Sequence, residues 1–353
     1  MGPLTEPASI LLDRTADEAF AGLDAAFLRG ATVLVTGATG LVGGTFVRAL
    51  LRASGKRGLG LRLVLPMRRS SRAAALFPDP CVHAVEWPGL LAPLEAPPAD
   101  FAVHAAAMTS SLDMVRRPAE TLLATFEGTR SFLEWARAGA VRKAVLLSSL
   151  EAYGIPPPER PDMDEASSGR LDPMNPRSSY PEGKRAAEAL CAAYAAQHGL
   201  PVCVARLAQT FGPGAEPGDR RAFAQFARVA LAGAPITLHT AGTTSRNYCH
   251  VADAAGALLA LLRDGVAGEA YNVAHDGSYV SVRELAARFA SAAGAGSRIE
   301  FDHAGEAAFG YAPELHVRLR TEKLAALGFR ARFDLGQAVS DLLDWYRLTL
   351  PPN

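Results

Sequence analysis

The chain has 353 residues, 49% of them hydrophobic and 20% charged, so it is long enough for one large or two fused globular domains and too apolar to be disordered. Lysine and arginine together number 36, as do aspartate and glutamate, and the formal net charge of zero argues against a nucleic-acid or anionic-membrane partner. The first residues show no basic segment followed by an apolar run, and no later stretch is apolar enough to span a bilayer, so we expect a cytoplasmic protein.

The predicted elements alternate between short apolar strands and helices. Residues 9–29 have helical periodicity and predict an accessory helix within residues 1–30. Strands are predicted at 31–36, 61–67, 82–87, 101–107, 143–150 and 201–207, with helices at 118–138 and in the segment that ends near 198. This alternation predicts an α/β fold with a doubly wound parallel sheet over residues 31–210, covered by helices on both faces.

After residue 210 the pattern changes. We predict a helix at 222–232, strands at 236–240 and 270–274, and a helix that begins at a Ser281 cap. These elements predict a smaller C-terminal α/β substrate lobe over residues 211–353, interleaved with the last part of the sheet. Loops rich in proline and glycine at 154–161 and 212–218 are expected to flank the cleft between the two parts.

A glycine turn joins the first strand to the helix that follows. In V-T-G-A-T-G-L-V-G, Gly37 permits the tight turn, Gly40 lets the backbone approach a pyrophosphate, and Gly43 lets helix and strand pack closely. The helix N-terminus offers free N–H groups to phosphates. The turn predicts a Rossmann-type dinucleotide site, with these contacts: Gly37, Thr39, Gly40, Leu41, Val42 and Gly43.

The segment after the second strand bears on the choice of cofactor. An NAD site usually has an acidic residue there for the ribose 2′-hydroxyl, but this chain reads L-P-M-R-R-S-S-R. Arg68 and Arg69 suit a 2′-phosphate and favour NADP, whereas a solvated basic turn or a tightly held NAD without the acidic contact is the alternative. NAD and NADP both stay open.

Tyr180 and Lys184 stand four residues apart in S-S-Y-P-E-G-K-R. On a helix this spacing puts both side chains on one face. A lysine ammonium beside a phenol favours the phenolate, so we expect a lowered pKa and a tyrosine that accepts a proton from a substrate hydroxyl as hydride leaves the same carbon.

Other kinds of site are not favoured. The four cysteines contain no C-x-x-C pair, which indicates reduced thiols. The histidines lack ligand spacing, so no metal site is predicted, and His104 at a strand end suits a structural role. Ser149 lies outside any G-x-S-x-G motif, so a hydrolase is not expected.

Several segments, in this order, resemble the extended short-chain dehydrogenase/reductase family of nucleotide-sugar epimerases, dehydratases and decarboxylases. They are T-G-A-T-G-L-V-G, H-A-A-A at 104–107, E-G-T-R-S-F-L-E-W-A from Glu127, L-L-S-S-L-E-A-Y-G ending at Gly154, Y-P-E-G-K, A-R-L-A-Q-T-F-G-P-G and S-R-N-Y-C-H-V-A-D-A-A. The resemblance runs from about Ala31 to the C-terminus. The segment that ends in S-R-N-Y-C-H-V-A-D is most similar to that of UDP-glucuronate decarboxylases and their neighbours.

The resemblance implies roles for individual residues. Tyr180 would be the catalytic base, Lys184 would bind the nicotinamide ribose, and Ser149 would hydrogen-bond the reacting oxygen. Glu151 would act near the sugar, with a surface position at the strand end as the alternative. Further cofactor contacts would be His104, Ala105, Ala106 and Ser148. Substrate contacts would be Gln209, Arg246 on the diphosphate, and Thr109.

One departure from the family pattern bears on the reaction. Leu150 stands where dehydratases have a proton donor and decarboxylases a serine. We therefore expect transient oxidation at C4 of a nucleotide-linked sugar, with epimerisation favoured over decarboxylation or 4,6-dehydration. An NADPH-dependent keto-sugar reductase and a non-catalytic dinucleotide sensor are the alternatives.

The resemblance also implies a homodimer that pairs helices, among them the helix that carries Tyr180. An apolar face for such an interface is expected at Ala186, Ala187, Leu190 and Tyr194, with ordinary core packing as the alternative.

Overall fold

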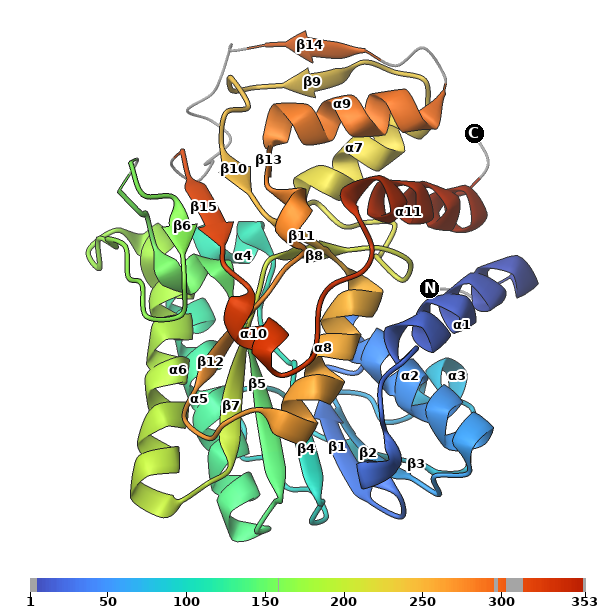
Figure 1. The fold of residues 1–353 in the computed structure, drawn as a ribbon, viewed down its shortest axis with the longest axis vertical. Coiled ribbons are helices and arrows are strands. Elements are labelled where there is room, and N and C mark those ends of the chain that lie inside the picture. Colours follow the sequence, from blue (N-terminus) through green and yellow to red (C-terminus); the bar gives the residue numbers. More distant parts are fainter. Residues whose placement is uncertain (1–4, 158, 295–297, 303–313, 352–353) are drawn as a thin grey trace.

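The main sheet is parallel throughout. The computed structural model describes residues 5–157, 159–294, 298–302 and 314–351. Within these residues seven strands lie in the order β12-β7-β5-β4-β1-β2-β3 (Figure 1). Their bounds are β1 Thr32–Thr36, β2 Arg62–Met67, β3 Val82–Glu86, β4 Phe101–His104, β5 Lys143–Ser149, β7 Val202–Leu207 and β12 Ala270–Val273. The Rossmann-type sheet expected from the sequence is confirmed.

Helices cover both faces of the sheet because strand side chains alternate in direction. Val145 of β5 packs toward α2 (Leu41–Arg57) and α8 (Val251–Asp264). Its neighbour Leu146 packs toward α5 (Pro118–Ala138) and α6 (Ser179–His198). The short helix α3 (Arg72–Leu76) follows β2, and α4 (Ser111–Arg116) precedes α5.

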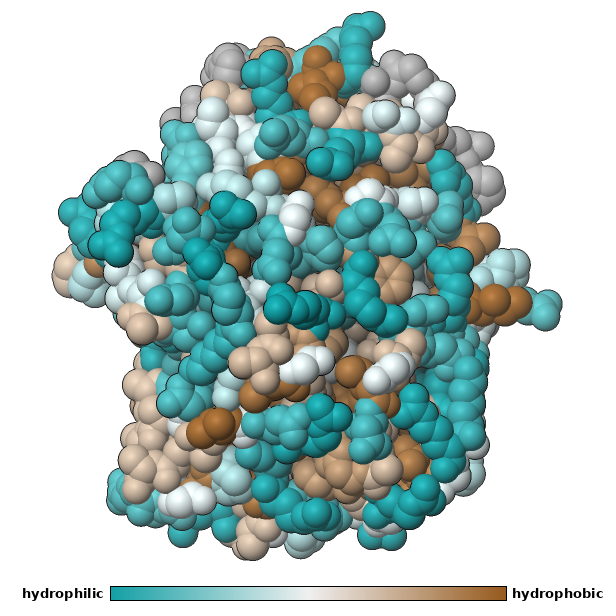
Figure 2. Space-filling model, viewed as in Figure 1, coloured by the Kyte–Doolittle hydropathy of each residue, from teal (hydrophilic) through white to brown (hydrophobic). Residues whose placement is uncertain are grey.

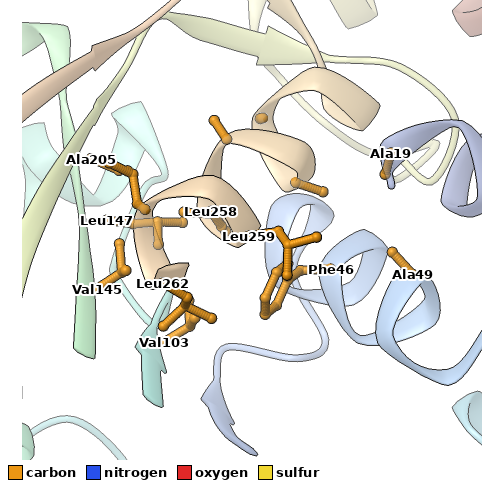
Figure 3. Close-up of a cluster of buried hydrophobic side chains, with 14 of the residues drawn as sticks. Ala19, Phe46, Ala49, Val103, Val145, Leu147, Ala205, Leu258, Leu259 and Leu262 are labelled. Carbon is orange, nitrogen blue, oxygen red and sulfur yellow. The ribbon is translucent and has the colours of Figure 1, made fainter. Parts of the chain in front are cut away.

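Helix α8 is the most deeply buried helix on its face of the sheet. Figure 3 shows Leu258, Leu259 and Leu262 of α8 between strand side chains such as Val103 and the ring of Phe46 in α2. All three leucines are at most 1% exposed. A helix buried nearly all round needs apolar residues on every side, and A-G-A-L-L-A-L-L supplies them.

The accessory helix is shorter than predicted. α1 spans Glu6–Ala19, and the chain then turns through Gly22, whose φ is +73°, into the 3₁₀ helix η1 (Ala26–Leu28). Phe20 packs edge-on against Phe46 at 5.7 Å between ring centroids. α1 therefore joins the core beside α2 and α8, and the continuous helix expected over 9–29 is wrong at its C-terminal end.

A second hydrophobic core holds the C-terminal lobe together. It is built by α7 (Ala222–Leu231), α9 (Val282–Ala293) and α11 (Leu335–Thr349). Ser281 caps α9 in a capping box with Glu284, as the sequence predicts. The short strands of this region are β6 Asp162–Met163, β8 Gln209–Phe211, β9 Ile236–Leu238, β10 Ser245–Arg246, β11 Tyr248–His250, β13 Val280–Ser281, β14 Ile299–Phe301 and β15 His316–Leu319. The remaining turns of helix are η2 Leu150–Tyr153, η3 Pro176–Ser178, η4 Asp276–Ser278 and α10 Glu322–Ala326.

The chain passes between the two parts more than once. After α7 and β9 in the lobe, α8 returns to the main sheet and β12 pairs in parallel with β7 as its edge strand. The chain then re-enters the lobe through β13 and α9 (Figure 1). The segment after residue 210 thus contributes both to the main sheet and to the lobe. A domain boundary between residues 210 and 211 stays a prediction.

Hydrophilic residues cover most of the face of the molecule shown in Figure 2, with hydrophobic residues in separate patches. Across the described ranges, no helix combines the length and apolar character that crossing a membrane requires.

Candidate active site

A large cleft lies between the carboxyl ends of the central strands and the C-terminal lobe. Its volume is about 2640 Å³, well above the roughly 300–1,000 Å³ of a typical small-ligand pocket. Its walls come from the turn after β1, the ends of β4 and β5, the start of α6, and β8 to β10. The cleft has room for two ligands side by side.

The glycine turn forms the floor of the cleft at the switch point between β1 and β4. Gly37 has φ +71°, and a Cβ there would lie 2.6 Å from the backbone of Ala105 and Ala106. A Cβ on Gly43 would lie 2.4 Å from the carbonyl oxygen of Gly37. Only glycine allows these approaches, and they leave the α2 N-terminus, without a side-chain cap at Gly40, facing the cleft.

All six residues predicted in this turn line the cleft: Gly37, Thr39, Gly40, Leu41, Val42 and Gly43. Ala105, Ala106 and Thr109 after β4 line it as well.

His104 lies apart from these residues. Its Nδ1 is 2.9 Å from the hydroxyl of Thr36, and its ring stacks on Phe132 with centroids 4.8 Å apart. Burial lowers its pKa to about 3, so the ring is neutral. His104 is buried and is not among the lining residues, so its side chain supports the floor of the site, and a cofactor contact at His104 stays a prediction.

The segment after β2 brings a cluster of arginines to one end of the cleft. Arg68 and Arg69 line it, and so does Arg72 at the start of α3. Arg72 was not predicted as a cofactor contact. Its place in R-R-S-S-R, three residues after Arg69, is the sequence signal for it. Within the described residues, neither β2 nor the loop after it supplies a carboxylate to the lining, and Glu86 at the end of β3 is also outside it.

Tyr180 and Lys184 project from the first turns of α6, 6% and 4% exposed. The Lys184 Nζ donates to the carbonyl oxygen of Leu147 at 2.8 Å and lies 5.8 Å from the centre of the Tyr180 ring. Burial lowers the pKa of Lys184 to about 8. The same helix face thus carries both groups, as the spacing predicts.

The expected lowering of the Tyr180 pKa is wrong for the protein without ligands. Burial raises this pKa, the charge of Glu151 raises it further, and a hydrogen bond with Ser149 opposes both. The ammonium of Lys184 is engaged with a backbone carbonyl instead of the phenol oxygen. A low pKa at Tyr180 therefore needs positive charge beyond what the protein supplies.

The last residue of β5 and the residues that follow it lie beside Tyr180. The Ser149 hydroxyl accepts from the backbone N–H of Glu151 at 3.2 Å. Leu150 is 3% exposed and lines the cleft. Arg177 reaches one carboxylate oxygen of Glu151 with both terminal nitrogens, at 3.3 and 3.4 Å. No sequence motif singles out Arg177, although it stands only three residues before Tyr180.

The opposite wall carries the predicted substrate residues. Gln209 in β8 and Arg246 in β10 both line the cleft. Among the described residues, the buried Nε of Arg246 has no hydrogen-bond partner. A buried guanidinium donor without a partner is costly, which indicates that an anionic or polar ligand completes it.

The described lining is strongly basic. The cationic side chains are Arg68, Arg69, Arg72, Arg116, Arg117, Arg170, Arg177, Lys184, Arg220, Arg221 and Arg246, against the carboxylates Glu120, Glu151, Asp172 and Glu314. Although the whole chain has no net charge, this surplus attracts anionic ligands.

Two further predictions need qualification. Ser148 lines the cleft, but its hydroxyl donates to Glu188. Ala187 is fully buried in the core between α6 and the sheet, so its place in a dimer interface is wrong. Tyr194 is half-buried, and its hydroxyl donates to Glu134 of α5.

The described residues contain no group of three or more histidine, cysteine, aspartate or glutamate side chains that could hold a metal ion.

A family model decides the relationship of this chain to known proteins. The model of the NAD dependent epimerase/dehydratase family matches residues 33–274, more than half of the chain. The chain belongs to the NAD-dependent epimerase/dehydratase family. Members of this family are enzymes, and the resemblance seen in the motifs is confirmed.

The relatives of this epimerase/dehydratase family member differ in activity. UDP-glucuronic acid decarboxylase 1 of Xenopus tropicalis is 36% identical over 168 residues, which cover 47% of this chain and 39% of the relative. The chain thus aligns with less than two thirds of that decarboxylase.

Solved structures agree in fold over about nine tenths of the chain. UDP-glucose 4-epimerase of Thermotoga maritima, solved with UDP-glucose, has a TM-score of 0.77 at 22% identity and covers 91% of this chain and 100% of its own. The dTDP-glucose 4,6-dehydratase DesIV of Streptomyces venezuelae, solved with NAD, has a TM-score of 0.74 at 24% identity, with 90% and 97% covered.

Proposed function

We propose that this family member is a nucleotide-sugar epimerase that oxidises its substrate transiently at C4. The observation that carries the proposal is the position of Tyr180, Lys184 and Ser149 in one cleft, with the glycine turn on one side and Arg246 on the other. The turn suits a dinucleotide, and the partnerless guanidinium suits the diphosphate of a second nucleotide.

Each of these residues has a role in the proposal. Tyr180 accepts the proton of the C4 hydroxyl, Ser149 hydrogen-bonds the same oxygen, and Lys184 binds a ribose hydroxyl of the cofactor. A nicotinamide held by these residues would supply reversible hydride transfer. The oxidised form of that ring would carry positive charge, and a cation near the buried phenol would favour the phenolate that Tyr180 needs.

Leu150 favours epimerisation. Loss of the C6 hydroxyl needs a proton donor beside the leaving group, and leucine cannot donate. Epimerisation needs only that the 4-keto intermediate present its other face before the hydride returns. The resemblance implies that Glu151 acts near the sugar, but its carboxylate is paired with Arg177. The carboxylate is therefore less available for acid–base chemistry, and a 4,6-dehydratase is less well supported.

Arg177 favours a second candidate, a decarboxylase of a nucleotide-linked uronic acid. Its contacts with Glu151 are long and reach only one oxygen, so the guanidinium keeps donors for another anion. It lies close enough to Tyr180 to affect the phenol electrostatically, and a C6 carboxylate held there would lie beside the reacting carbon. An uncharged hexose has no carboxylate that could accept from these N–H groups of Arg177.

The cofactor preference is a separate proposal. The family name supports NAD, but Arg68, Arg69 and Arg72 offer charge for a 2′-phosphate where an NAD site has a carboxylate. We infer that the site accepts NADP at least as well as NAD. If NADPH is consumed stoichiometrically, the protein is a keto-sugar reductase and not a recycling enzyme.

One experiment separates these candidates. The purified protein is denatured to release any nucleotide for mass analysis, then assayed with UDP-, dTDP-, CDP- and GDP-linked hexoses and uronic acids. We expect a C4 epimer by NMR without net change in cofactor absorbance. Loss of CO₂ from a uronic acid supports the decarboxylase, loss of water the dehydratase, and net NADPH oxidation the reductase. Absence of turnover on every sugar contradicts the proposal and favours a dinucleotide sensor.

A homodimer and a cytoplasmic location also stay proposals. Leu122 and Leu123 of α5 are 38% and 50% exposed on the helix beside α6, which supports an interface there. Light scattering after size-exclusion chromatography tests the dimer.

A further inference from the structure

A buried ion pair lies behind the candidate catalytic residues. The Glu188 carboxylate of α6 accepts from Arg206 of β7, with Nη2 at 2.7 Å from one oxygen and Nε at 3.0 and 3.2 Å from the two oxygens. The side chains are 11% and 15% exposed. Arg206 also donates to the carbonyl oxygen of Glu165 at 3.0 Å, and it covers the ring of Tyr153. A pair so fully bonded is held in a single geometry.

The pair is tied to the end of β5 through Ser148, whose hydroxyl donates to Glu188. The residue before it, Leu147, accepts the hydrogen bond of Lys184, and the residue after it is Ser149. Since Lys184 and Glu188 are one helical turn apart, α6 contacts consecutive residues of β5 through consecutive turns. Ser149, Tyr180 and Lys184 are held in register by these contacts.

Few charges surround Lys184. His104 of β4 lies near enough to feel its charge, but burial keeps that ring neutral. Burial raises the pKa of the Cys191 thiol of α6, so it stays protonated. Tyr180 is a neutral phenol in the ligand-free protein. Among the described residues, Glu188, paired with Arg206, therefore remains the charged group that acts on Lys184.

Burial and Glu188 act on Lys184 in opposite directions. Burial favours the neutral amine, and the carboxylate favours the ammonium. Of the charges that act on Lys184, that of Glu188 has the largest effect.

We propose that Glu188 is a positioning residue that keeps Lys184 in its ammonium form at working pH, with Ser148 and Arg206 holding the carboxylate in place. An ammonium has three donors for the Leu147 carbonyl and for ligand oxygens, and it favours a phenolate at Tyr180. A neutral amine has fewer hydrogen-bond donors and lacks the positive charge that favours the Tyr180 phenolate. The inference about turnover rests on the proposed function, whereas the charge state of Lys184 does not.

The small number of lysines makes a direct test possible. The chain has four, Lys56, Lys143, Lys184 and Lys323, so protein labelled with ¹³C-lysine gives few side-chain signals, and Lys184→Arg assigns the one that matters. Glu188→Gln is expected to move the Lys184 titration midpoint at least about one pH unit lower, the usual size for loss of a close opposite charge. Glu134→Gln is the control, because this glutamate pairs with Arg137 on the surface of α5. It should leave the midpoint unchanged.

The single substitution leaves Arg206 buried without a partner and risks unfolding. The double substitution Glu188→Gln with Arg206→Gln removes both charges and should lower the midpoint as well. An unchanged Lys184 midpoint in a folded variant of either kind overturns the proposal.

Turnover gives the second readout. In Glu188→Gln the alkaline limb of the kcat profile should move to lower pH by the same amount as the NMR midpoint, whereas a merely structural role would lower kcat equally at every pH. The NMR titration needs neither substrate nor cofactor. If the wild-type protein turns over no nucleotide sugar, the proposed function fails while the test of Glu188 still stands.

Discussion

At the scale of the residue, Tyr180 combines a buried position with a reaction that requires it to lose a proton. The substitution Tyr180→Phe removes the acceptor and keeps the ring, so we expect kcat to fall at least about a hundredfold while dinucleotide binding persists. Turnover and equilibrium dialysis with the cofactor measure the two effects. Tyr194→Phe, on the same helix but bonded to Glu134, is the matched control and should keep wild-type activity. Comparable activity in both variants would show that another group takes the proton.

A separate prediction concerns Arg246, because its buried Nε lacks a hydrogen-bond partner among the described residues. Arg246→Ala should raise KM for the nucleotide sugar about tenfold or more, the usual size for a hydrogen bond to a charged group, with cofactor affinity unchanged. Arg318→Ala on the adjoining strand β15 is the control, since Arg318 is half exposed and pairs with Asp162. A raised cofactor Kd in place of a raised KM would assign Arg246 to the other ligand.

The sequence predicted these residues because spacing along one helix or one strand end is a local property. Tyr180 and Lys184 share a helix face, and Ser149 ends a strand, so both facts follow from short stretches of sequence. The contact between Arg177 and Glu151 joins residues 26 positions apart, and that between Arg206 and Ser148 runs through Glu188. Such contacts depend on how α6 lies against β5, which no local pattern contains. The same is true of the raised pKa of Tyr180, which is a consequence of burial.

At the scale of the element, α2 offers a comparison of two glycines in one helix. A Cβ at Gly43 would lie 2.4 Å from the Gly37 carbonyl, whereas a Cβ at Gly55 meets nothing within 4 Å. Gly43→Ala should therefore distort the turn and weaken dinucleotide binding at least tenfold. Gly55→Ala should leave binding unchanged and stabilise the protein by roughly 0.5–1 kcal/mol, as alanine does in helix interiors. Calorimetric titration and urea unfolding of both variants test this, and equal binding by the two would show that the turn does not contact the ligand.

The accessory helix shows where periodicity is insufficient. Apolar residues continue at helical spacing beyond Ala19, so the sequence predicted one helix up to 29. Gly22 adopts a left-handed conformation there, and Phe27 turns to pack edge-on against Phe101 of β4. Periodicity records which residues are buried and does not distinguish burial along one helix from burial in two segments.

At the scale of the whole molecule, two buried histidines link stability to pH. Burial lowers the pKa of His104 and of His250 to about 3, so neither ring accepts a proton in the folded protein above that pH. In the unfolded chain each binds a proton near pH 6.5, so the unfolded state gains protons as pH falls below 6.5. Each histidine should therefore lower the free energy of unfolding by about 1.4 kcal/mol per pH unit between roughly pH 6 and pH 3.

His250→Asn isolates one of these contributions. The Nδ1 of His250 caps α8 by accepting from the N–H of Ala252, and an asparagine oxygen can take that role. Between pH 7 and pH 5 the wild type should lose about 2 kcal/mol more stability than the variant, measured by urea unfolding. The Asp341 carboxylate 3.5 Å from Nε2 favours a charged ring, but burial and the nearby Arg14 outweigh it. Parallel pH profiles of the two proteins would mean that Asp341 keeps His250 protonated.

The return of the chain to the main sheet has a consequence for how the protein is made. β7 ends at Leu207, but β12, which pairs with its outer edge, is not complete until Val273. On the ribosome, the growing sheet thus presents an open strand edge, and one face without α8, while more than sixty further residues are added. A pause in translation within that interval would prolong the exposure of both. Synonymous codon changes between these two strands should therefore alter the yield of native protein without altering the protein itself.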